Sequence, residues 1–423
     1  MIDINLIRTQ PELVKAAVKN KNEKADISRI LQLDQQYRDV LKEVEALRSQ
    51  KNTASEEIGR LKKEKKDASE ILAKMKSIAE RQKTLENSLE PIKTSLDELL
   101  KWVPNIPDND VPAGPDASGN QLVKTYGEKK VFDFAPKPHY DIAENLGLAD
   151  FKRAAKIAGA SFILFTGHGA MLERALINFM LDLHVHQHKY TEISPPYLAN
   201  PACMFGTGQL PKLEEDMYKI PKDEFYLNPT AEVPLTNIHR DEILDLNQLP
   251  IYYTAYTACF RREAGAYGKD TRGFVRVHQF DKVELVKFAH PEKSAEEHEK
   301  LLADAEEVLQ MLGLHYRVVK LCTGDMSFAS AKTYDIELWA PGMDRWLEVS
   351  SCSNFRDFQA RRANIRFRDQ DGKVKFAHTL NGSGVALPRL VIAILENCQQ
   401  KDGSVKLPEL LAPYTNGIIE FKS

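Results

Sequence analysis

Apolar positions that recur every seven residues dominate the N-terminal quarter of the chain. One ladder comprises Ile30, Tyr37, Val44, Lys51 and Ile58, and a second, three residues later, comprises Leu33, Val40, Leu47, Ala54 and Leu61. Two such ladders form the seam of a coiled-coil helix. We therefore predict a helix from Ile30 to Leu61, roughly 50 Å long at 1.5 Å per residue.

A second pair of ladders predicts a return helix. It comprises Ile71, Ile78, Leu85, Ile92 and Leu99, with Met75, Gln82, Leu89 and Leu96 in the other register. The apolar pattern lapses before it, and Asp67-Ala-Ser-Glu70 resembles a capping box that starts a helix. The turn is expected near Lys65 to Ser69, and Pro91 is expected to kink the second helix. The pattern predicts an antiparallel hairpin that projects into solvent.

A segment rich in Pro, Gly, Asn and Asp follows the hairpin and is typical of a linker. We therefore divide the chain into an arm (1–102), a linker (103–120) and a body (121–423). The body mixes strand-like and helical segments without regular βαβ order. This pattern favours an α+β fold with a mostly antiparallel sheet flanked by helices.

Within the body, the segment from 256 to 286 is the most informative. Tyr256–Glu263 and Gly273–Val286 are rich in aromatic and β-branched residues, and glycines lie between them, which predicts an antiparallel hairpin. Its arms are expected to place five side chains on one sheet face: Arg261, Glu263, Arg276, Phe280 and Glu284. Guanidinium groups bind phosphates, an aromatic ring stacks on a base, and a carboxylate accepts from an exocyclic amine. The pattern indicates a nucleotide site.

Composition narrows the possible classes of protein. A length of 423 residues suggests two or three domains. The net charge of −3 excludes a globally basic protein that coats nucleic acid. Basic side chains nevertheless gather around the predicted helical turn: Arg60, Lys62, Lys63, Lys65, Lys66, Lys74 and Lys76. Phosphates are a plausible target for them. The alternative is that these lysines only solvate an exposed helix.

The cysteines and the apolar runs indicate where the protein resides. The five cysteines are odd in number and lack metal-binding spacing, so we expect reduced core thiols. His184, His186 and His188 would lie on one helix at a spacing that cannot bring all three to one ion, and no metal is expected there. The chain shows neither a basic leader with an apolar run nor a stretch of ~20 apolar residues. We expect a cytoplasmic protein without a membrane span.

Three further segments carry candidate chemistry. Thr230-Ala231-Glu232 offers a hydroxyl and a carboxylate that can receive an ammonium group, although such a triplet alone is more often a turn or a cap. Glu348 and Ser351 offer oxygen ligands for Mg²⁺. Thr379–Arg389 is expected to form a strand, a glycine turn and the start of a helix. Arg389 would then lie near a helix N-terminus, where anionic phosphate is favoured.

Taken together, these segments resemble the motifs of class II aminoacyl-tRNA synthetases, and most closely the bacterial type of seryl-tRNA synthetase. Phe260-Arg-x-Glu, the glycine-rich loop and Arg276-x-His-Gln-Phe280 resemble motif 2. The helix-like segment 172–188, with the strand and prolines that follow it, is similar to motif 1, and 379–389 is similar to motif 3. One departure is the run Ala386-Leu-Pro388, because the family more often has small residues before this arginine.

The resemblance implies a role for each candidate residue. It implies contacts with ATP for Arg261, Arg262, Glu263, Arg276, Phe280, Glu348, Val349, Ser350, Ser351 and Arg389. It implies contacts with serine for Thr230, Ala231, Glu232, Arg261, Glu284, Asn381 and Ser383. Glu348 and Ser351 would hold Mg²⁺, and Arg261, Arg389 and Glu348 would be the catalytic residues.

The same resemblance implies the activity and the partners. The expected reaction is ATP-dependent activation of L-serine followed by transfer to the 3′ end of tRNA(Ser), gripped by the helical arm. A homodimer built through motif 1, with Pro196, is implied, and service of tRNA(Sec) stays open. Two alternatives also stay open: a related ligase that loads a carrier protein, and a catalytically silent RNA-binding paralogue.

Overall fold

The computed structural model describes residues 1–264 and 272–422 and divides into two compact units. The arm unit comprises Ile2–Lys19 and Glu23–Pro104. The body unit comprises Met1, Asn20–Asn22 and Asn105–Ser423. In the described residues, no helix has both the length and the apolar character needed to cross a membrane.

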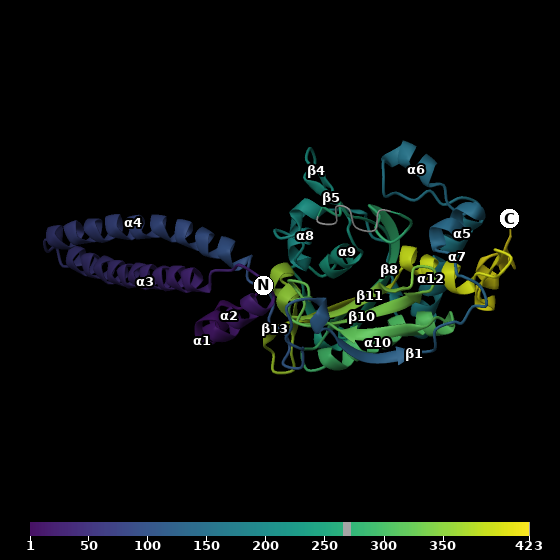
Figure 1. Ribbon diagram of the computed structural model, residues 1–423. Coiled ribbons are helices and arrows are strands. Elements are labelled where there is room, and N and C mark those ends of the chain that lie inside the picture. The colour runs from purple at the N-terminus through teal and green to yellow at the C-terminus, as the bar shows by residue number, and fades with distance from the viewer. Residues whose placement is uncertain (265–271, 423) are drawn as a thin grey trace. The chain divides into compact units, whose positions relative to one another are not determined.

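Two long helices of the arm unit form the predicted coiled-coil hairpin (Figure 1). After the short helices α1 (Ile4–Thr9) and α2 (Pro11–Asn20), the hairpin consists of α3 (Ile27–Lys63) and α4 (Ser69–Leu100). Seam residues are buried on both helices, among them Val44, Ile58 and Ile78. Helix α4 continues through Pro91, because proline removes only one backbone hydrogen bond while the apolar seam continues on both sides.

The turn between these helices differs in one detail from the predicted capping box. Asp67 Oδ1 accepts from the Ser69 backbone N–H at 3.0 Å, and α4 begins at Ser69 without a side-chain cap at Ala68. Asp67 therefore closes a local turn with a residue two positions away instead of forming the reciprocal contact with Glu70. Lys65, at φ 54°, supplies the left-handed residue of the turn.

The body unit is built on an eight-stranded sheet in the order β1-β9-β10-β11-β14-β8-β7-β2. The neighbours are antiparallel except β2 and β7, which are parallel. In this order the strands are Gln121–Tyr126, Tyr316–Lys320, Lys332–Ala340, Arg345–Arg356, His378–Ala386, Gln279–Ala289, Ile251–Phe260 and Thr191–Glu192. The α+β fold with a mostly antiparallel sheet is confirmed.

Helices surround this sheet (Figure 1). One large apolar core is shared by the central strands and by α7 (His168–Asp182), α10 (Ser294–Met311) and α12 (Leu387–Cys398). The shorter helices are α5 (His139–Asn145), α6 (Phe151–Ala158), α8 (Pro201–Thr207), α9 (Glu232–Asn237) and α11 (Phe358–Ala363). The small sheets comprise β3 (Leu198–Ala199), β4 (Lys219–Ile220), β5 (Phe225–Leu227), β6 (Ile243–Asp245), β12 (Arg366–Arg368), β13 (Val374–Phe376), β15 (Val405–Lys406) and β16 (Glu420–Phe421).

The predicted nucleotide hairpin exists, but its two strands stop earlier than expected at the end where the loop joins them. Strands β7 and β8 pair from Ile251↔Phe288 to Phe260↔Gln279. Arg261, Glu263 and Arg276 therefore follow or precede the strands and do not share a strand face, which corrects the prediction. The reason is backbone conformation, because Glu263 at φ 52° cannot continue a strand. Most of the glycine-rich loop, 265–271, lies outside the described residues.

The predicted glycine turn in motif 3 is wrong, since β14 runs without a turn from His378 to Ala386 and α12 follows at once. Instead, the absence of a Cβ at two of these glycines lets neighbouring side chains pack against the backbone of β14. A Cβ on Gly382 would lie 2.9 Å from Cys352 Sγ, and one on Gly384 would lie 2.7 Å from His184 Nε2. In motif 1, α7 ends in one π-helical turn, η2 (Leu183–Gln187), and the strand after it is only the two residues of β2.

Candidate functional site

A cavity of about 270 Å³ opens beside the end of the β7–β8 hairpin. Its walls include Arg261, Glu263, Arg276, Phe280, Glu348, Val349, Ser383 and Arg389. These residues come from the hairpin, from β11, from β14 and from the first turn of α12. The structure thus brings together side chains that are up to 128 positions apart in the sequence.

The hairpin side of this cavity combines an aromatic ring with two arginines. The Arg261 guanidinium carbon lies 5.2 Å from the centroid of the Phe280 ring, and Arg261 Nε donates to the Pro229 carbonyl at 3.3 Å. Arg276 Nη1 donates to Glu263 Oε2 at 2.9 Å. An aromatic face with guanidinium groups beside it suits a base with attached phosphates.

Arg389 forms the opposite side. It is the third residue of α12, so its guanidinium adds to the positive end of the helix dipole. Its Nη1 donates to the Glu348 carbonyl at 2.6 Å and lies 3.8 Å from Glu348 Oε2. This wall is suited to a phosphate group.

Glu348 and Ser351 lie on either side of a bulge in β11, where Ile336↔Ser350 is followed by Glu337↔Glu348. A third oxygen-bearing residue that the sequence analysis missed, Asp335, pairs with Ser351 across the strands. Burial, and then the charge of Glu348, raise the pKa of Asp335 well above its usual range. Its Oδ1 is buried without a hydrogen-bond partner among the described residues. Two carboxyl groups and a hydroxyl fit the oxygen-ligand chemistry of Mg²⁺.

A second cavity, of about 380 Å³, shares Arg261, Glu263 and Arg276 with the first and extends to Thr230 and Glu232. Thr230 Oγ1 donates to Glu284 Oε2 at 3.0 Å. Lys282, another residue that the sequence analysis missed, donates to Thr230 Oγ1 at 2.8 Å and forms an ion pair with Glu284. Thr230, Lys282 and Glu284 are all buried. Arg261 stands where the two cavities meet.

The carboxyl group of Glu232 is held in the wall of the second cavity. Gln359 Nε2 donates to Glu232 Oε1 at 2.6 Å and to the Thr207 carbonyl at 3.1 Å. Burial, followed by the negative charge of Glu284, raises the pKa of Glu232 to about 7. Glu232 can therefore exchange its proton near neutral pH, when a cation approaches.

These geometric observations can be set beside known proteins. A model of the seryl-tRNA synthetase N-terminal domain matches residues 1–107, and a model of the tRNA synthetase class II core domain (G, H, P, S and T) matches residues 215–398. A serine–tRNA ligase from Thermodesulfovibrio yellowstonii is 56% identical over 98% of both chains, and one from Syntrophobacter fumaroxidans is 55% identical over 99% of both. The chain belongs to the serine–tRNA ligase family.

A solved structure agrees with this membership of the serine–tRNA ligase family. The seryl-tRNA synthetase from Pyrococcus horikoshii, whose crystal structure was determined in complex with ATP, is 41% identical. It covers 100% of this chain and 99% of its own, with a TM-score of 0.95. The similarity therefore includes the arm unit as well as the body unit.

Some residues expected from the seryl-tRNA synthetase resemblance lie apart from the two cavities. The Arg262 side chain lines a separate hollow with Glu214 and Lys219. Ala231 is packed in the apolar core. Ser350 is buried, and its Oγ donates to the Ser383 carbonyl at 2.6 Å, so it contacts the cavity wall from behind.

The remaining predicted serine contacts lie on β14. Ser383 is directly opposite Glu284 in the β14–β8 ladder, and Asn381 is opposite Val286, two positions away on the same strand face. Ser383 lines the first cavity. The hydroxyl of Ser383 and the Glu284 carboxylate thus belong to one cross-strand pair.

Proposed function

We propose that this chain activates L-serine with ATP to form seryl-adenylate and then transfers the seryl group to the 3′ end of tRNA(Ser). One observation carries the proposal: Arg261 stands between a cavity lined by phosphate-binding side chains and a cavity lined by Thr230 and Glu232. A guanidinium in that position can contact a carboxylate and a phosphate together. The known activity of the family agrees with this arrangement.

In the proposed reaction the serine carboxylate attacks the α-phosphate of ATP and displaces pyrophosphate. Arg261 holds the α-phosphate and the carboxylate, while Arg276 and Arg389 hold the outer phosphates. Phe280 stacks on adenine, and Glu263 accepts from its amino group. Catalysis consists of positioning and charge neutralisation, and no general base is required because the serine carboxylate is already ionised.

We assign Mg²⁺ to Glu348 and Ser351, with Asp335 beside them. When bound, the ion neutralises phosphate charge as it develops on the leaving group. Glu348 is half exposed toward the cavity, which leaves its carboxylate accessible. The buried Oδ1 of Asp335, which has no hydrogen-bond partner in the part of the chain that the structure describes, supports a cation at this point.

Selection of serine is assigned to Glu284, Thr230 and Ser383. A buried carboxylate that accepts from both the ammonium group and the side-chain hydroxyl disfavours alanine, because the missing hydroxyl leaves a desolvated acceptor without a partner. Asn381 is assigned to the same hydroxyl, and Glu232 to the ammonium group.

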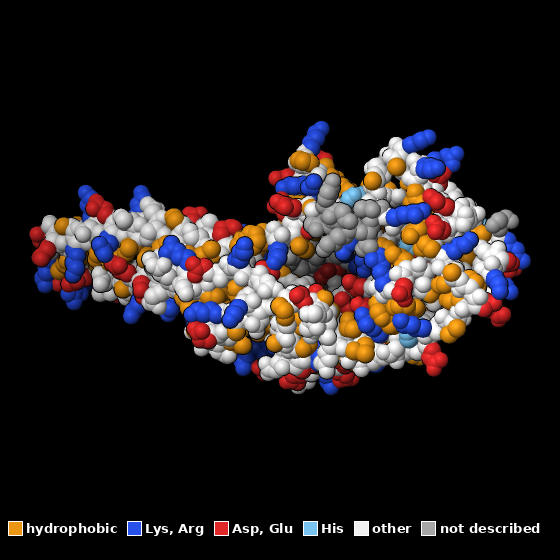
Figure 2. All heavy atoms as spheres, in the orientation of Figure 1, with side chains coloured by type: hydrophobic (Ala, Val, Ile, Leu, Met, Phe, Trp, Pro, Cys, Tyr) orange, Lys and Arg blue, Asp and Glu red, His pale blue; other side chains and the backbone are white. Residues whose placement is uncertain are grey.

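We assign tRNA binding to the arm (1–102), which the linker (103–120) joins to the body (121–423). Lys and Arg side chains gather at the end of the hairpin where α3 and α4 meet, interspersed with acidic ones (Figure 2). Phosphate contacts of this kind bind without reading base sequence. The proposal includes a cytoplasmic homodimer built through α7 and Pro196, because that segment resembles motif 1, and leaves service of tRNA(Sec) open.

Amino-acid-dependent exchange of pyrophosphate into ATP tests the first step. With saturating Mg²⁺, we expect exchange with serine and little with threonine, alanine, glycine or proline. Absence of exchange with all five would overturn the proposal in favour of a silent RNA-binding paralogue. Exchange with serine without charging of tRNA would favour a ligase for a carrier protein.

A further inference from the structure

The hydroxyl group of Thr230, in the wall of the second cavity, uses all of its hydrogen-bonding capacity. Thr230 Oγ1 donates to Glu284 Oε2 at 3.0 Å. It accepts from Lys282 Nζ at 2.8 Å and from the Glu232 backbone N–H at 3.2 Å. A hydroxyl group offers one hydrogen and two lone pairs. The ammonium group of serine can therefore donate to Thr230 only after one of these two donors has left.

Of the two donors, Lys282 is the one that can move. The Glu232 N–H belongs to the backbone at the start of α9, where the Val233 N–H also binds the Thr230 carbonyl at 3.1 Å. The Lys282 Nζ atom, by contrast, is at the end of a flexible stem of four carbon atoms. We therefore expect the ammonium group of serine to displace the ammonium group of Lys282.

Lys282 already has contacts that the proposed function gives to serine. Its Nζ donates to Thr230 Oγ1 and forms an ion pair with Glu284. Both side chains of this ion pair are buried, with exposed fractions of 7% for Lys282 and 1% for Glu284. A second ammonium group at the same place would add a buried charge of the same sign, which is strongly unfavourable. The lysine thus occupies the place proposed for the ammonium group of serine.

The displaced Nζ would face the first cavity, because the Lys282 side chain lines that cavity. Glu263, in the same cavity, pairs with Arg276. Glu348, on the opposite wall, pairs with Arg389. A buried ammonium group without an anionic partner is costly. The phosphates assigned to this cavity supply negative charge, so the displaced lysine is favoured there when ATP is bound.

We propose that Lys282 binds the phosphates of ATP after serine has displaced it from Thr230 and Glu284. One lysine then links the two substrates, because serine supplies the ammonium group that releases it and ATP supplies the anion that receives it. By thermodynamic linkage, each substrate strengthens the binding of the other by the same factor. The inference rests on the proposed function, because it requires serine and ATP in these two cavities.

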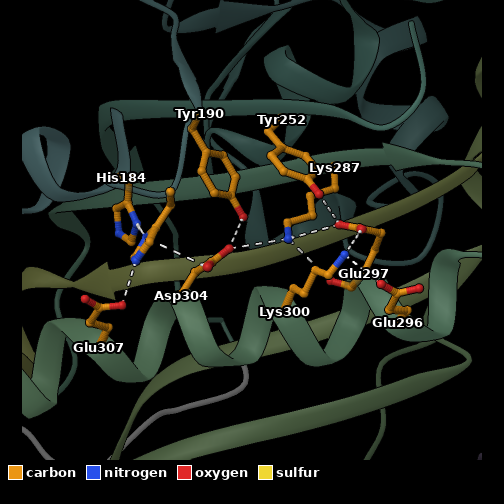
Figure 3. A network of polar contacts seen from close by, with 10 residues as sticks. His184, Tyr190, Tyr252, Lys287, Glu296, Glu297, Lys300, Asp304 and Glu307 are labelled. Carbon is orange, nitrogen blue, oxygen red and sulfur yellow. Dashed lines mark hydrogen bonds and ion pairs between the residues drawn. The ribbon is translucent and has the colours of Figure 1, made fainter. Parts of the chain in front are cut away.

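A second buried lysine on β8, Lys287, provides a matched control. Its side chain is 1% exposed, and its Nζ lies 3.3 Å from Glu297 Oε2 and 3.4 Å from Asp304 Oδ2, beside the Tyr252 ring (Figure 3). Among the described residues, those that line the two cavities include Lys282 and not Lys287. A variant of Lys287 therefore measures the effect of removing a buried lysine from β8 without a change in either cavity wall.

Isothermal titration calorimetry of serine tests the link between the substrates. The serine dissociation constant is measured with saturating Mg²⁺, first without nucleotide and then with an ATP analogue whose α,β-methylene bridge prevents adenylate formation. For the wild type and for Lys287→Met, we expect the analogue to lower this constant about tenfold. For Lys282→Met, we expect the analogue to have almost no effect. Serine alone should bind this variant at least as tightly as it binds the wild type, because no lysine has to be displaced.

Two calorimetric results would overturn the inference. One is an effect of the analogue on Lys282→Met as large as its effect on the wild type. The other is weaker binding of serine alone to Lys282→Met with unchanged thermal unfolding, since that result would give Lys282 a supporting role at Thr230 and Glu284 and no need to leave them.

A crystal structure of the wild-type protein with serine and the same analogue tests the displacement without any variant. We expect Lys282 Nζ within hydrogen-bonding distance of a phosphate oxygen, and the ammonium group of serine on Thr230 and Glu284. A lysine that stays on Thr230 in this complex would refute the inference, even in a protein that shows serine-dependent pyrophosphate exchange. A displaced lysine in a protein without that exchange would refute the proposed function alone.

Discussion

The carboxyl group of Glu232 is subject to two opposing influences. Burial and the charge of Glu284 favour its protonated form, while Gln359, Lys282 and Arg261 favour the carboxylate. The first two are stronger, and the pKa rises to about 7. An incoming ammonium group would add to the second set, so serine binding and proton release from Glu232 are linked.

This linkage makes the pH dependence of serine binding a test of Glu232. Since the carboxylate form of Glu232 binds the ammonium group, we expect the serine KM of the wild type to fall as pH rises through about 7. In Glu232→Gln that dependence disappears and serine KM is higher at pH about 8. The measurement is serine KM against pH, with ATP KM as the control; an unchanged profile in the variant would contradict the role.

Glu232 also affects the stability of the ligand-free protein. The pKa of Glu232 is raised from 4.5 to about 7 in the folded state, so its protonated form favours folding. This contribution to the free energy of unfolding is present at low pH and is lost as pH rises through about 7. Glu232→Gln should therefore unfold at a higher temperature than wild type at pH about 8. This control shows that weaker serine binding does not come from a damaged fold.

Arg261 and Arg262 are neighbours in the sequence with different surroundings. Arg261 lines both cavities, whereas Arg262 lines a separate hollow. We expect Arg261→Ala to lower serine-dependent pyrophosphate exchange by at least ~10³-fold, and Arg262→Ala to lower it far less. Comparable losses in the two variants would contradict this difference between the two arginines.

Site residues that could be predicted from the sequence differ physically from those that could not. Arg261, Phe280, Glu284 and Arg389 belong to recurring motifs, so their types and spacing were informative. Lys282 and Gln359 act through buried contacts with residues distant in the sequence, Thr230 and Glu232, for which the linear pattern carries no signal. Asp335 could have been suspected, because it is a charged residue within a strand-like run.

At the scale of elements, periodicity predicted the arm well and the site strands less well. The heptads extend over whole helices, and α3 begins only three residues before the predicted start. Bulges, by contrast, depend on one extra residue in a ladder, as at Val349 in β11 and at Gly384 in β14. Such local shifts are set by packing against neighbouring elements and do not alter the hydrophobic pattern.

The end of the helical hairpin offers a test of tRNA binding. Replacing Lys62, Lys63 and Lys66 with alanine removes three positive charges from exposed positions. We expect the KM for tRNA to rise about tenfold or more and its salt dependence to weaken, while serine-dependent pyrophosphate exchange stays unchanged. The matched control is Lys15, Lys19 and Lys24 to alanine, in the same unit. Equal effects of both triple variants would contradict a phosphate-binding tip.

At the scale of the whole molecule, the division into two compact units predicts that the two steps of the reaction are separable. Deletion of residues 29–100 removes the coiled coil from α3 to α4. We expect the shortened protein to retain serine-dependent pyrophosphate exchange and to lose charging of tRNA(Ser). Appreciable seryl-tRNA formation by this protein would contradict the role assigned to the arm.

The ion pairs of the site have a consequence for ligand exchange. Arg276 pairs with Glu263, Arg389 with Glu348, and Lys282 with Glu284, so several of the charged groups assigned to ligands already have an internal counter-ion. An arriving phosphate, magnesium ion or ammonium group must therefore compete with a tethered partner of its own sign. The same partner is ready to return when the product leaves, which favours turnover over tight retention of the ligand.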